Sequence, residues 1–415
     1  MAECEGAASD GRRVSPRVAA LAVNGGRPVR DRLLPYGHQV VDDADIAAVV
    51  QVLRGEWLTT GPAVAEFEER FAAAVGARYA VAVSSGTAAL HAAAHAAGLG
   101  PGDEVVVPAI TFAATANAVC YLGARPVFAD VRRDTLNLDA EHAGALVTAR
   151  TRAVFAVDFT GQPADYDGLR DLAGRRKLLL VADAAHALGA RYHGRPVGSL
   201  AAMTAFSLHP VKLITSGEGG VVVTDDPNLA ARLRTFRNHG ITTDHRQREA
   251  AGSWMYEMRE LGFNYRLTDF QCALAASQLD KLSRWLARRR VIAARYAQAL
   301  AAVPELELPT VPEWSEPAWH LYVVRLHLDR LRVGRGEVFA ALRAEGIGVN
   351  VHYIPVPWHP YYQALGYRRG QWPVAEAEYE RLLSLPLWAG MSDADVDDTV
   401  AAVHKVLDAY RETRA

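Results

Sequence analysis

The sequence predicts an α/β fold: a mostly parallel, seven-stranded sheet with helices on both faces, followed by a smaller α+β carboxyl-terminal domain. Two observations predict this architecture, one for the sheet and one for the number of domains. Short, almost wholly apolar runs alternate with helix-length segments from residue 77 onward, which is typical of parallel strands buried on both faces. The chain has 415 residues, enough for one large domain with an appended smaller one.

The amino-terminal part predicts an arm and two helices. Residues 1–33 are rich in Gly, Arg, Ser and Ala and show no sustained periodicity, so we expect a loose arm. Residues 42–54 carry apolar side chains at helical spacing, at Ile46, Val49, Val50 and Leu53. A second helix is expected over 63–75, because Gly-Pro at 61–62 is a helix start signal.

Seven apolar runs form the expected strands. Six are separated by longer connections: YAVAV at 79–83, EVVVP at 104–108, PVFAD at 126–130, AVFAVD at 153–158, KLLLVAD at 177–183 and TAFSL at 204–208. The seventh, GGVVVTDD at 219–226, follows after a connection too short for a helical crossover. We therefore expect this strand to run antiparallel to its neighbour.

The pattern changes towards the carboxyl terminus. A long helical region is expected over 269–302, followed by the proline-bearing stretch 304–317 and the strand-like run WHLYVVRLHL. Further helices are expected over 335–345 and 393–410. These features divide the chain into an arm at 1–33, a large domain at 34–290 and a small domain at 291–415.

Charge and cysteine content narrow the class of protein. Lysine and arginine number 45 against 47 acidic residues, a net charge of −2 that gives no electrostatic reason to expect nucleic acid or a membrane surface. Cys4, Cys120 and Cys272 are far apart and form no Cys-x-x-Cys pair, so neither disulfides nor a metal site is expected. Without a secretory or membrane-spanning apolar segment, the expected location is the cytoplasm.

A phosphate site is one interpretation of the run VSSGTAAL at 83–90. A strand ends there in Ser-Ser-Gly-Thr and an alanine-rich helix begins at once. Free amide groups at a helix start, a glycine that permits close approach and a neighbouring hydroxyl together suit a phosphate. The alternative is an ordinary Ser/Thr helix cap.

A carboxylate at a strand end is a second candidate. Asp183 lies at the carboxyl end of a buried strand, where doubly wound sheets place their ligands. Asp130 and Asp158 hold similar positions, so position alone does not choose among the three. His186 follows three residues after Asp183, and a histidine in this position is more often packed than catalytic.

An amine nucleophile has only four candidates, because the chain has four lysines. Lys212 lies between two apolar strands, where a charged amine is costly unless it is paired or neutralised. Lys177 begins a strand, and Lys281 and Lys405 lie on helices among residues that suggest solvated faces. If the protein forms a Schiff base, Lys212 is the expected residue.

Five segments occur in a familiar order. They are SSGTAAL, PAITFAATANAV at 108–119, DAAHALGA, SLHPVKLITSGEGG and LGFNYRLTDFQCAL at 261–274. Together they resemble the sugar aminotransferases of the DegT/DnrJ/EryC1/StrS family, which are fold type I pyridoxal-phosphate enzymes. The resemblance covers about residues 30–410.

The resemblance implies roles for individual residues. Lys212 matches the lysine that forms a Schiff base with the cofactor and then moves a proton on the substrate. Asp183 matches the carboxylate that keeps the pyridine nitrogen protonated. The other matches contact the cofactor: Gly86, Thr87, Ala88 and Ser207 at the phosphate, Phe112 stacked on the ring and His186 beside it.

Two matches imply a second subunit. Asn264 matches an asparagine that crosses from the neighbouring subunit to the cofactor phosphate, and Arg266 is a candidate for the same shared site or for the substrate. A complete site would then require a homodimer.

The implied substrates are a nucleotide-linked 4-keto-6-deoxy sugar, aminated at C4, and an amino-acid donor, usually glutamate. The segments VHYIPVPWHPYY and SLPLWAGMSDADVD resemble the transaminases that make UDP-4-amino-4,6-dideoxy-N-acetyl-β-L-altrosamine. PVPWHPYY is bulkier and more aromatic than expected there. His352, Tyr353 and Trp358 could contact the sugar or nucleotide, or simply pack.

Three other functions are compatible with parts of the pattern. A ketocyclitol aminotransferase, acting on a scyllo-inosose type of substrate, would share the TSGEGG run, although HPVK argues mildly against it. A sugar 3-dehydratase would have histidine in place of Lys212. A non-catalytic regulatory protein on the same scaffold is the alternative of another class, because a fold alone does not establish activity.

Overall fold

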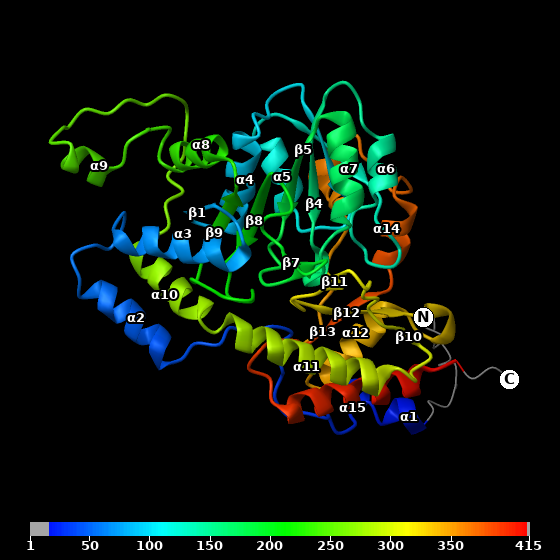
Figure 1. Ribbon diagram of the computed structural model, residues 1–415. Helices are drawn as coiled ribbons and strands as arrows, with labels where there is room; N and C mark the ends of the chain where they lie inside the picture. The colour runs from blue at the N-terminus through cyan, green and yellow to red at the C-terminus, as the bar shows by residue number, and fades with distance from the viewer. Residues whose placement is uncertain (1–15, 413–415) are drawn as a thin grey trace, which may run out of the picture.

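The computed structural model describes residues 16–412. A seven-stranded sheet fills the upper half of the molecule as drawn in Figure 1, and a smaller, mainly helical half lies below it. The strands are β1 (Tyr79–Val83), β2 (Glu104–Pro108), β3 (Arg125–Ala129), β4 (Thr151–Val157), β5 (Leu179–Asp183), β8 (Met203–Ser207) and β9 (Gly220–Thr224).

The sheet confirms the predicted architecture. Its strand order is β1-β9-β8-β5-β4-β2-β3, and the neighbours from β8 to β3 pair in parallel. Strand β9 runs antiparallel to both β8 and β1, as the short connection after β8 predicts. A parallel pair needs a long crossover, whereas an antiparallel pair does not.

Helices cover both faces because the side chains of each strand alternate between two apolar cores. In β1, Ala80 and Ala82 face one core, and Val81 and Val83 face the other. The first core contains side chains of α3 (Pro62–Val75), α7 (Tyr166–Arg176) and α10 (Asp269–Leu279). The second contains α4 (Gly86–Ala96), α5 (Ala114–Cys120) and α8 (Pro227–Arg237).

Shorter elements complete the large half. They are α2 (Asp43–Leu53), α6 (Ala140–Ala145), α9 (His245–Ala250) and a small sheet of β6 (Arg191–Tyr192), β7 (Arg195–Pro196) and β11 (Ser315–Glu316). Helix α9 lies on a long excursion from the body, at the upper left of Figure 1.

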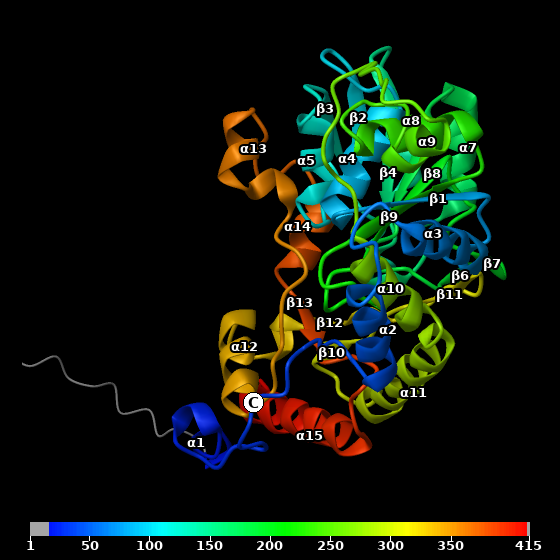
Figure 2. The ribbon, with the colours of Figure 1, turned by 90° about the vertical axis from the view of Figure 1, so that its left-hand side faces the viewer.

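The smaller half has its own core. An antiparallel sheet of β10 (Leu306–Glu307), β12 (Tyr322–Leu326) and β13 (Leu382–Leu385) packs with α12 (Arg335–Ala344) and α15 (Asp393–Tyr410). The predicted final helix has the same bounds as α15. Not all of the carboxyl-terminal part lies here, because α13 (Pro360–Ala364) and α14 (Pro373–Tyr379) run up beside β3 and α5 (Figure 2).

The prediction of a loose arm was wrong for its described part, whereas residues 1–15 lie outside the described residues. Residues 16–19 form α1 (Pro16–Ala19), and Leu21 is fully buried against the smaller half. Glu345 accepts hydrogen bonds from the backbone of Ala22 and Val29, at 2.9 and 3.0 Å. Burial and paired backbone groups therefore hold a segment that carries no periodic pattern.

The expected helical region at 269–302 is broken at residues 280–281, between α10 and α11 (Leu282–Leu300). Lys281 lies at this break and forms ion pairs with Asp42 and Asp45, so the prediction of a solvated lysine was wrong. The division predicted between residues 290 and 291 falls within α11. Its first part, with Trp285, packs in the large half and its second part, with Tyr296, in the smaller half.

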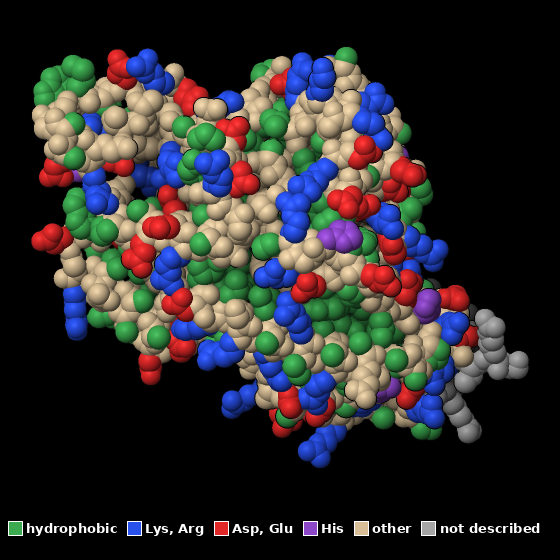
Figure 3. Space-filling view, in the orientation of Figure 1, with side chains coloured by type: hydrophobic (Ala, Val, Ile, Leu, Met, Phe, Trp, Pro, Cys, Tyr) green, Lys and Arg blue, Asp and Glu red, His purple; other side chains and the backbone are tan. Residues whose placement is uncertain are grey.

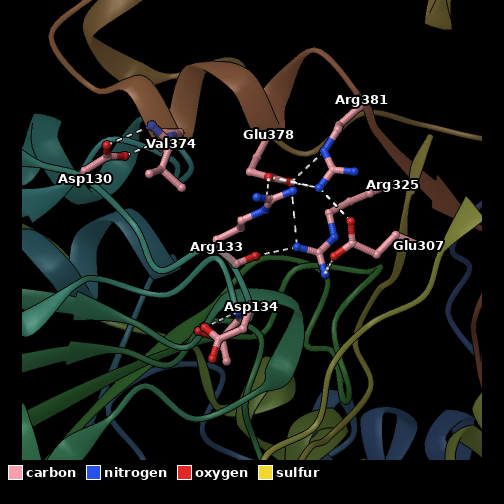
Figure 4. A network of polar contacts seen from close by, with 10 residues as sticks. Asp130, Arg133, Asp134, Glu307, Arg325, Val374, Glu378 and Arg381 are labelled. Atoms are coloured by element: carbon pink, nitrogen blue, oxygen red, sulfur yellow. Dashed lines mark hydrogen bonds and ion pairs between the residues drawn. The ribbon is translucent and has the colours of Figure 1, made fainter. Parts of the chain in front are cut away.

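A network of charged side chains joins the two halves (Figure 4). The guanidinium of Arg325, on β12, is almost completely buried and lies 2.8 Å from Glu307 and 3.6 Å from Glu378. It also donates to the backbone carbonyl of Arg133, in the loop after β3.

Within the described residues, no helix is long and apolar enough to cross a bilayer.

Candidate active site

A cavity of about 490 Å³ lies at the carboxyl ends of β4, β5 and β8. This is the edge where parallel sheets place their ligands. Most of the residues singled out from the sequence line this one cavity: Gly86, Thr87, Phe112, Asp183, His186, Ser207, Lys212, His352 and Tyr353.

The start of α4 forms one wall of the cavity. Ser85 caps the helix, and its hydroxyl accepts from the amide of Ala88 at 3.0 Å. The first helical amides, of Gly86 and Thr87, face no acceptor within the described residues and are therefore free for an anion. Ala88 does not line the cavity, and its amide is used by the cap.

Ser207 lies next to this helix start. A Cβ added at Gly86 would lie 2.9 Å from the Cβ of Ser207 and 3.0 Å from its hydroxyl. Glycine at residue 86 thus leaves room beside a serine hydroxyl and two free amides. This set of donors fits a phosphate group.

Asp183 is the strand-end carboxylate that faces the cavity. It is buried, and it accepts hydrogen bonds from the hydroxyl of Thr115 at 2.7 Å and from the amide of Ala185 at 3.2 Å. Burial raises the pKa of this carboxyl, and the hydrogen bonds and the charge of Lys212 oppose the rise. A cationic group in the cavity would find a buried acceptor there.

The other two strand-end carboxylates have structural partners. Asp130 caps α14, where it accepts from the amides of Val374 and Ala375 at 2.9 and 2.7 Å (Figure 4). Asp158 accepts from the Ala164 amide and the Tyr166 hydroxyl, both at 2.8 Å. The structure therefore distinguishes the three aspartates, whereas their positions in the sequence do not.

Lys212 is the lysine that the cavity contains. Burial lowers the pKa of its amine to about 8, and the nearby charge of Asp183 limits the fall. Within residues 16–412, no hydrogen bond or ion pair holds this amine. Lys281 and Lys405 are held in ion pairs with carboxylates, and Lys177 caps the end of α7.

A group of aromatic and imidazole rings lines another part of the cavity. His186 lies with its Nε2 3.1 Å from the Tyr353 hydroxyl and its ring 4.4 Å from that of His320. Burial lowers the pKa of His186 well below its ordinary value, so the ring is neutral. The ring of Phe112 lies 5.8 Å from that of Tyr353 and projects into the open cavity.

Several cavity residues were missed by sequence reasoning. Tyr36, Glu218, His320 and Asn350 line the cavity but come from loops far apart in the chain. Glu218 belongs to the TSGEGG run but received no role from it, whereas no functional motif named above includes Tyr36, His320 or Asn350, which only the folded chain brings together.

Besides Ala88, three residues singled out from the sequence do not line this cavity. Asn264 is exposed and pairs with Asn238 through a backbone bridge. Arg266 donates to the Asn238 side chain at 2.9 Å and lines a different cavity, of about 480 Å³. Trp358 packs against the Tyr379 ring at 5.3 Å and under the Arg369 guanidinium at 4.0 Å, and it does not line this cavity.

The charged residues of the described chain form no metal site. Among residues 16–412, no group of three or more His, Cys, Asp or Glu side chains is arranged to hold a metal ion.

Comparison with known proteins identifies the family of this chain. The model of the DegT/DnrJ/EryC1/StrS aminotransferase family matches residues 39–404. The chain belongs to this family. A curated relative is the spore coat polysaccharide biosynthesis protein SpsC of Bacillus subtilis, 43% identical over 381 residues, which are 91% of this chain and 98% of SpsC.

Solved structures of this family have the same fold. PseC of Helicobacter pylori, an aminotransferase in pseudoaminic acid biosynthesis, is 29% identical with a TM-score of 0.85, over 91% of this chain and 100% of PseC. DesI, solved in the presence of its TDP-sugar product, is 34% identical with a TM-score of 0.83, over 94% of this chain and 97% of DesI.

The family also identifies the cofactor. A structure from Streptococcus pneumoniae, 31% identical with a TM-score of 0.85 over 91% of this chain and 99% of that one, is in its PLP form. The same protein has a PMP form. Pyridoxal phosphate is accordingly the cofactor of this aminotransferase. The donors at Gly86, Thr87 and Ser207, the carboxylate of Asp183 and the amine of Lys212 fit its phosphate, ring nitrogen and aldehyde.

Proposed function

We propose that the protein transfers an amino group from an amino acid, with glutamate as the expected donor, to the C4 keto group of a nucleotide-linked 4-keto-6-deoxy sugar. The observation that carries this proposal is the placement of Lys212, Asp183 and the start of α4 around one cavity. The sugar substrate is supported by the family and by DesI, which was solved with a TDP-sugar.

The cofactor supplies, when bound, an electron-withdrawing ring that stabilises negative charge on the substrate carbon next to nitrogen. In the proposed reaction, Gly86 and Thr87 donate their amides, and Ser207 its hydroxyl, to the phosphate. Asp183 holds the proton on the ring nitrogen, and its burial from water strengthens that contact.

Lys212 has two proposed tasks. Its Nζ would bind the aldehyde group of the cofactor in the resting enzyme, and as a free amine it would hold the substrate proton and move it to a neighbouring atom. A pKa of about 8 suits both tasks, because the amine is then partly neutral near pH 7.5 and still acidic enough as an ammonium to give the proton back.

The proposed sugar-facing wall consists of His186, His352 and Tyr353. His352 is buried, its Nδ1 lies 2.7 Å from the Ser384 hydroxyl, and burial lowers its pKa to about 3. His186 and His352 are thus both neutral. Neutral rings beside Lys212 add no positive charge, so they leave the amine free to lose its proton.

A homodimer is part of the proposal. Asn264 is exposed in the single chain. A residue that contacts a neighbouring subunit has to be exposed in this way. Exposed apolar side chains surround it in sequence: Trp254, Met255, Tyr256, Met258, Leu261 and Phe263. Figure 3 shows hydrophobic side chains at the surface over the excursion that carries α9, at the upper left. A second copy that covers this excursion would bury them.

One assay tests the proposed function. The protein is incubated with pyridoxal phosphate, glutamate and a panel of UDP- and dTDP-linked 4-ketosugars, and the products are identified by mass. We expect an amino sugar from at least one member of the panel and none with Lys212→Ala. Lys177→Asn is the matched control, because Lys177 is exposed at a left-handed position that asparagine tolerates, and it should keep full activity.

Two results would contradict the proposal. If Lys212→Ala turned over near the wild-type rate, the catalytic role proposed for the Lys212 amine would be refuted. A wild-type protein that holds the cofactor on Lys212 after borohydride reduction, yet aminates only a ketocyclitol, would replace the proposed substrate and leave the cofactor site intact.

A further inference from the structure

Thr115 connects the carboxylate of Asp183 to the turn that carries Phe112. It is the second residue of α5 and is fully buried. Its hydroxyl oxygen lies 2.7 Å from Asp183 Oδ2, 2.7 Å from the hydroxyl oxygen of Thr111 and 3.2 Å from the carbonyl oxygen of Phe112. Thr111 is buried as well.

The number of hydroxyl protons determines which group donates in each of these hydrogen bonds. Thr115 has one hydroxyl proton, and it donates this proton to Oδ2 of Asp183, which is closer than the carbonyl oxygen of Phe112. Thr111 can then donate to Thr115, since either oxygen of that pair can be the donor. The chain runs from Thr111 through Thr115 to Asp183, and every proton in it points towards the carboxylate.

The second donor to Asp183 is weaker. The amide of Ala185 lies 3.2 Å from Oδ1, on the other oxygen of the carboxylate. Within residues 16–412, two hydrogen bonds hold the Asp183 side chain, and the one from the Thr115 hydroxyl is the shorter. A hydrogen bond to a charged group that is buried contributes more than one at the surface.

We propose that Thr115 is a positioning residue for transamination: its hydroxyl orients the Asp183 carboxylate and keeps it ionised, so that the proton between this carboxylate and the cofactor stays on the ring nitrogen. The inference rests on the role proposed above for Asp183. Thr115 does not line the cavity and acts only through Asp183.

The position of that proton can be observed directly. Solid-state ¹⁵N NMR of the holoenzyme, loaded with cofactor labelled at the ring nitrogen, reports the share of protonated nitrogen without any turnover. In Thr115→Val, which keeps the shape and removes the donor, the ratio of unprotonated to protonated nitrogen should rise about tenfold. Thr115→Ser keeps the hydroxyl and should restore the wild-type signal.

A double-mutant cycle separates positioning from a structural effect. In Asp183→Asn the nitrogen should be unprotonated, and adding Thr115→Val should change neither the ¹⁵N shift nor kcat further. Alone, Thr115→Val should lower kcat about tenfold. A wild-type ¹⁵N signal in Thr115→Val, or an equal fall in kcat in the Asp183→Asn background, would overturn the inference.

The same experiment distinguishes the two proposals. If the labelled cofactor is not held on Lys212 in the wild-type protein, the proposed function fails. If it is held there with a protonated nitrogen that Thr115→Val leaves unchanged, only the role of Thr115 fails. Should Thr115→Val not fold, Thr111→Val removes the outer hydroxyl and should produce a smaller shift in the same direction.

Discussion

Gly86 and Ser207 face each other so closely that a side chain on residue 86 would meet the serine: the added Cβ would lie 2.9 Å from the Cβ of Ser207. Real Cβ atoms essentially never approach other atoms to less than 3.0 Å, so either Ser207 or the start of α4 would have to move. Both contribute to the anion-binding wall of the cavity. A methyl group at residue 86 would therefore disturb cofactor binding before it disturbs the fold.

We expect Gly86→Ala to weaken the binding of pyridoxal phosphate by about tenfold or more, since about 1.4 kcal/mol of lost contact corresponds to a factor of ten. Equilibrium titration of the apoprotein measures this. Gly174→Ala is the matched control: Gly174 lies in α7, and a Cβ there meets no atom within 4 Å. That variant should bind the cofactor normally and be about 0.5 kcal/mol more stable. Normal binding by Gly86→Ala would show that the phosphate lies elsewhere.

The pKa of Lys212 predicts how fast the apoprotein takes up its cofactor at different pH. Only the neutral amine attacks an aldehyde, and burial lowers the pKa of this amine to about 8. The attachment rate, followed by absorbance in a stopped-flow instrument, should rise about fivefold from pH 7 to pH 8 and less than about twofold above pH 8.

A variant tests the direction of this effect. Because the charge of Asp183 favours the ammonium form of Lys212, Asp183→Asn should move the midpoint of the rate profile to lower pH. A rate that continues to rise beyond pH 10 would mean that Lys212 behaves like a lysine in water.

The network between the two halves should contribute to stability. Arg325→Ala removes a buried guanidinium and leaves Glu307 and Glu378 without one of their partners, which should cost about 3 kcal/mol. Arg133→Ala is the control, because its exposed guanidinium lies 3.6 Å from Glu378 and should contribute less than about 1 kcal/mol. Denaturant unfolding compares the two variants. Equal losses would show that burial does not decide the contribution.

The apolar excursion should be buried in the assembled protein. Leu261 is 78% exposed in the single chain, and Leu261→Glu places a charge where the proposed second copy packs. We expect a monomer with weakened cofactor retention and an unchanged circular dichroism spectrum. Val291→Glu, on the half-exposed face of α11, is the control and should remain dimeric. Sedimentation of a wild-type monomer would refute the shared site.

Much of the sheet and of its ligand edge could be predicted because both depend on local patterns. Each expected strand appears within a few residues of its predicted bounds, since short apolar runs such as YAVAV at 79–83 are typical of strands that are buried on both faces. Lys212 could be identified because the chain has few lysines and only this one lies between buried strands.

The rest depends on contacts between distant segments. Thr115 approaches Asp183 across 68 residues of sequence, and no pattern in either segment indicates the pairing. Leu21 is buried only because the smaller half supplies a core for it, so the arm looked loose in the sequence. The choice among Asp130, Asp158 and Asp183 likewise depends on which amides and hydroxyls the folded chain presents to each.

Helix α11 belongs to both halves, with Trp285 in one core and Tyr296 in the other. Between them, the buried guanidinium of Arg289 donates to the carbonyls of Trp319 and Leu387, at 2.9 and 3.0 Å. A motion that opened the two halves would have to kink a continuous helix and break the hydrogen bonds of Arg289. Within one subunit, the spacing of the two halves around the cavity is thus fixed when the chain folds, so a ligand meets this part of the cavity already formed.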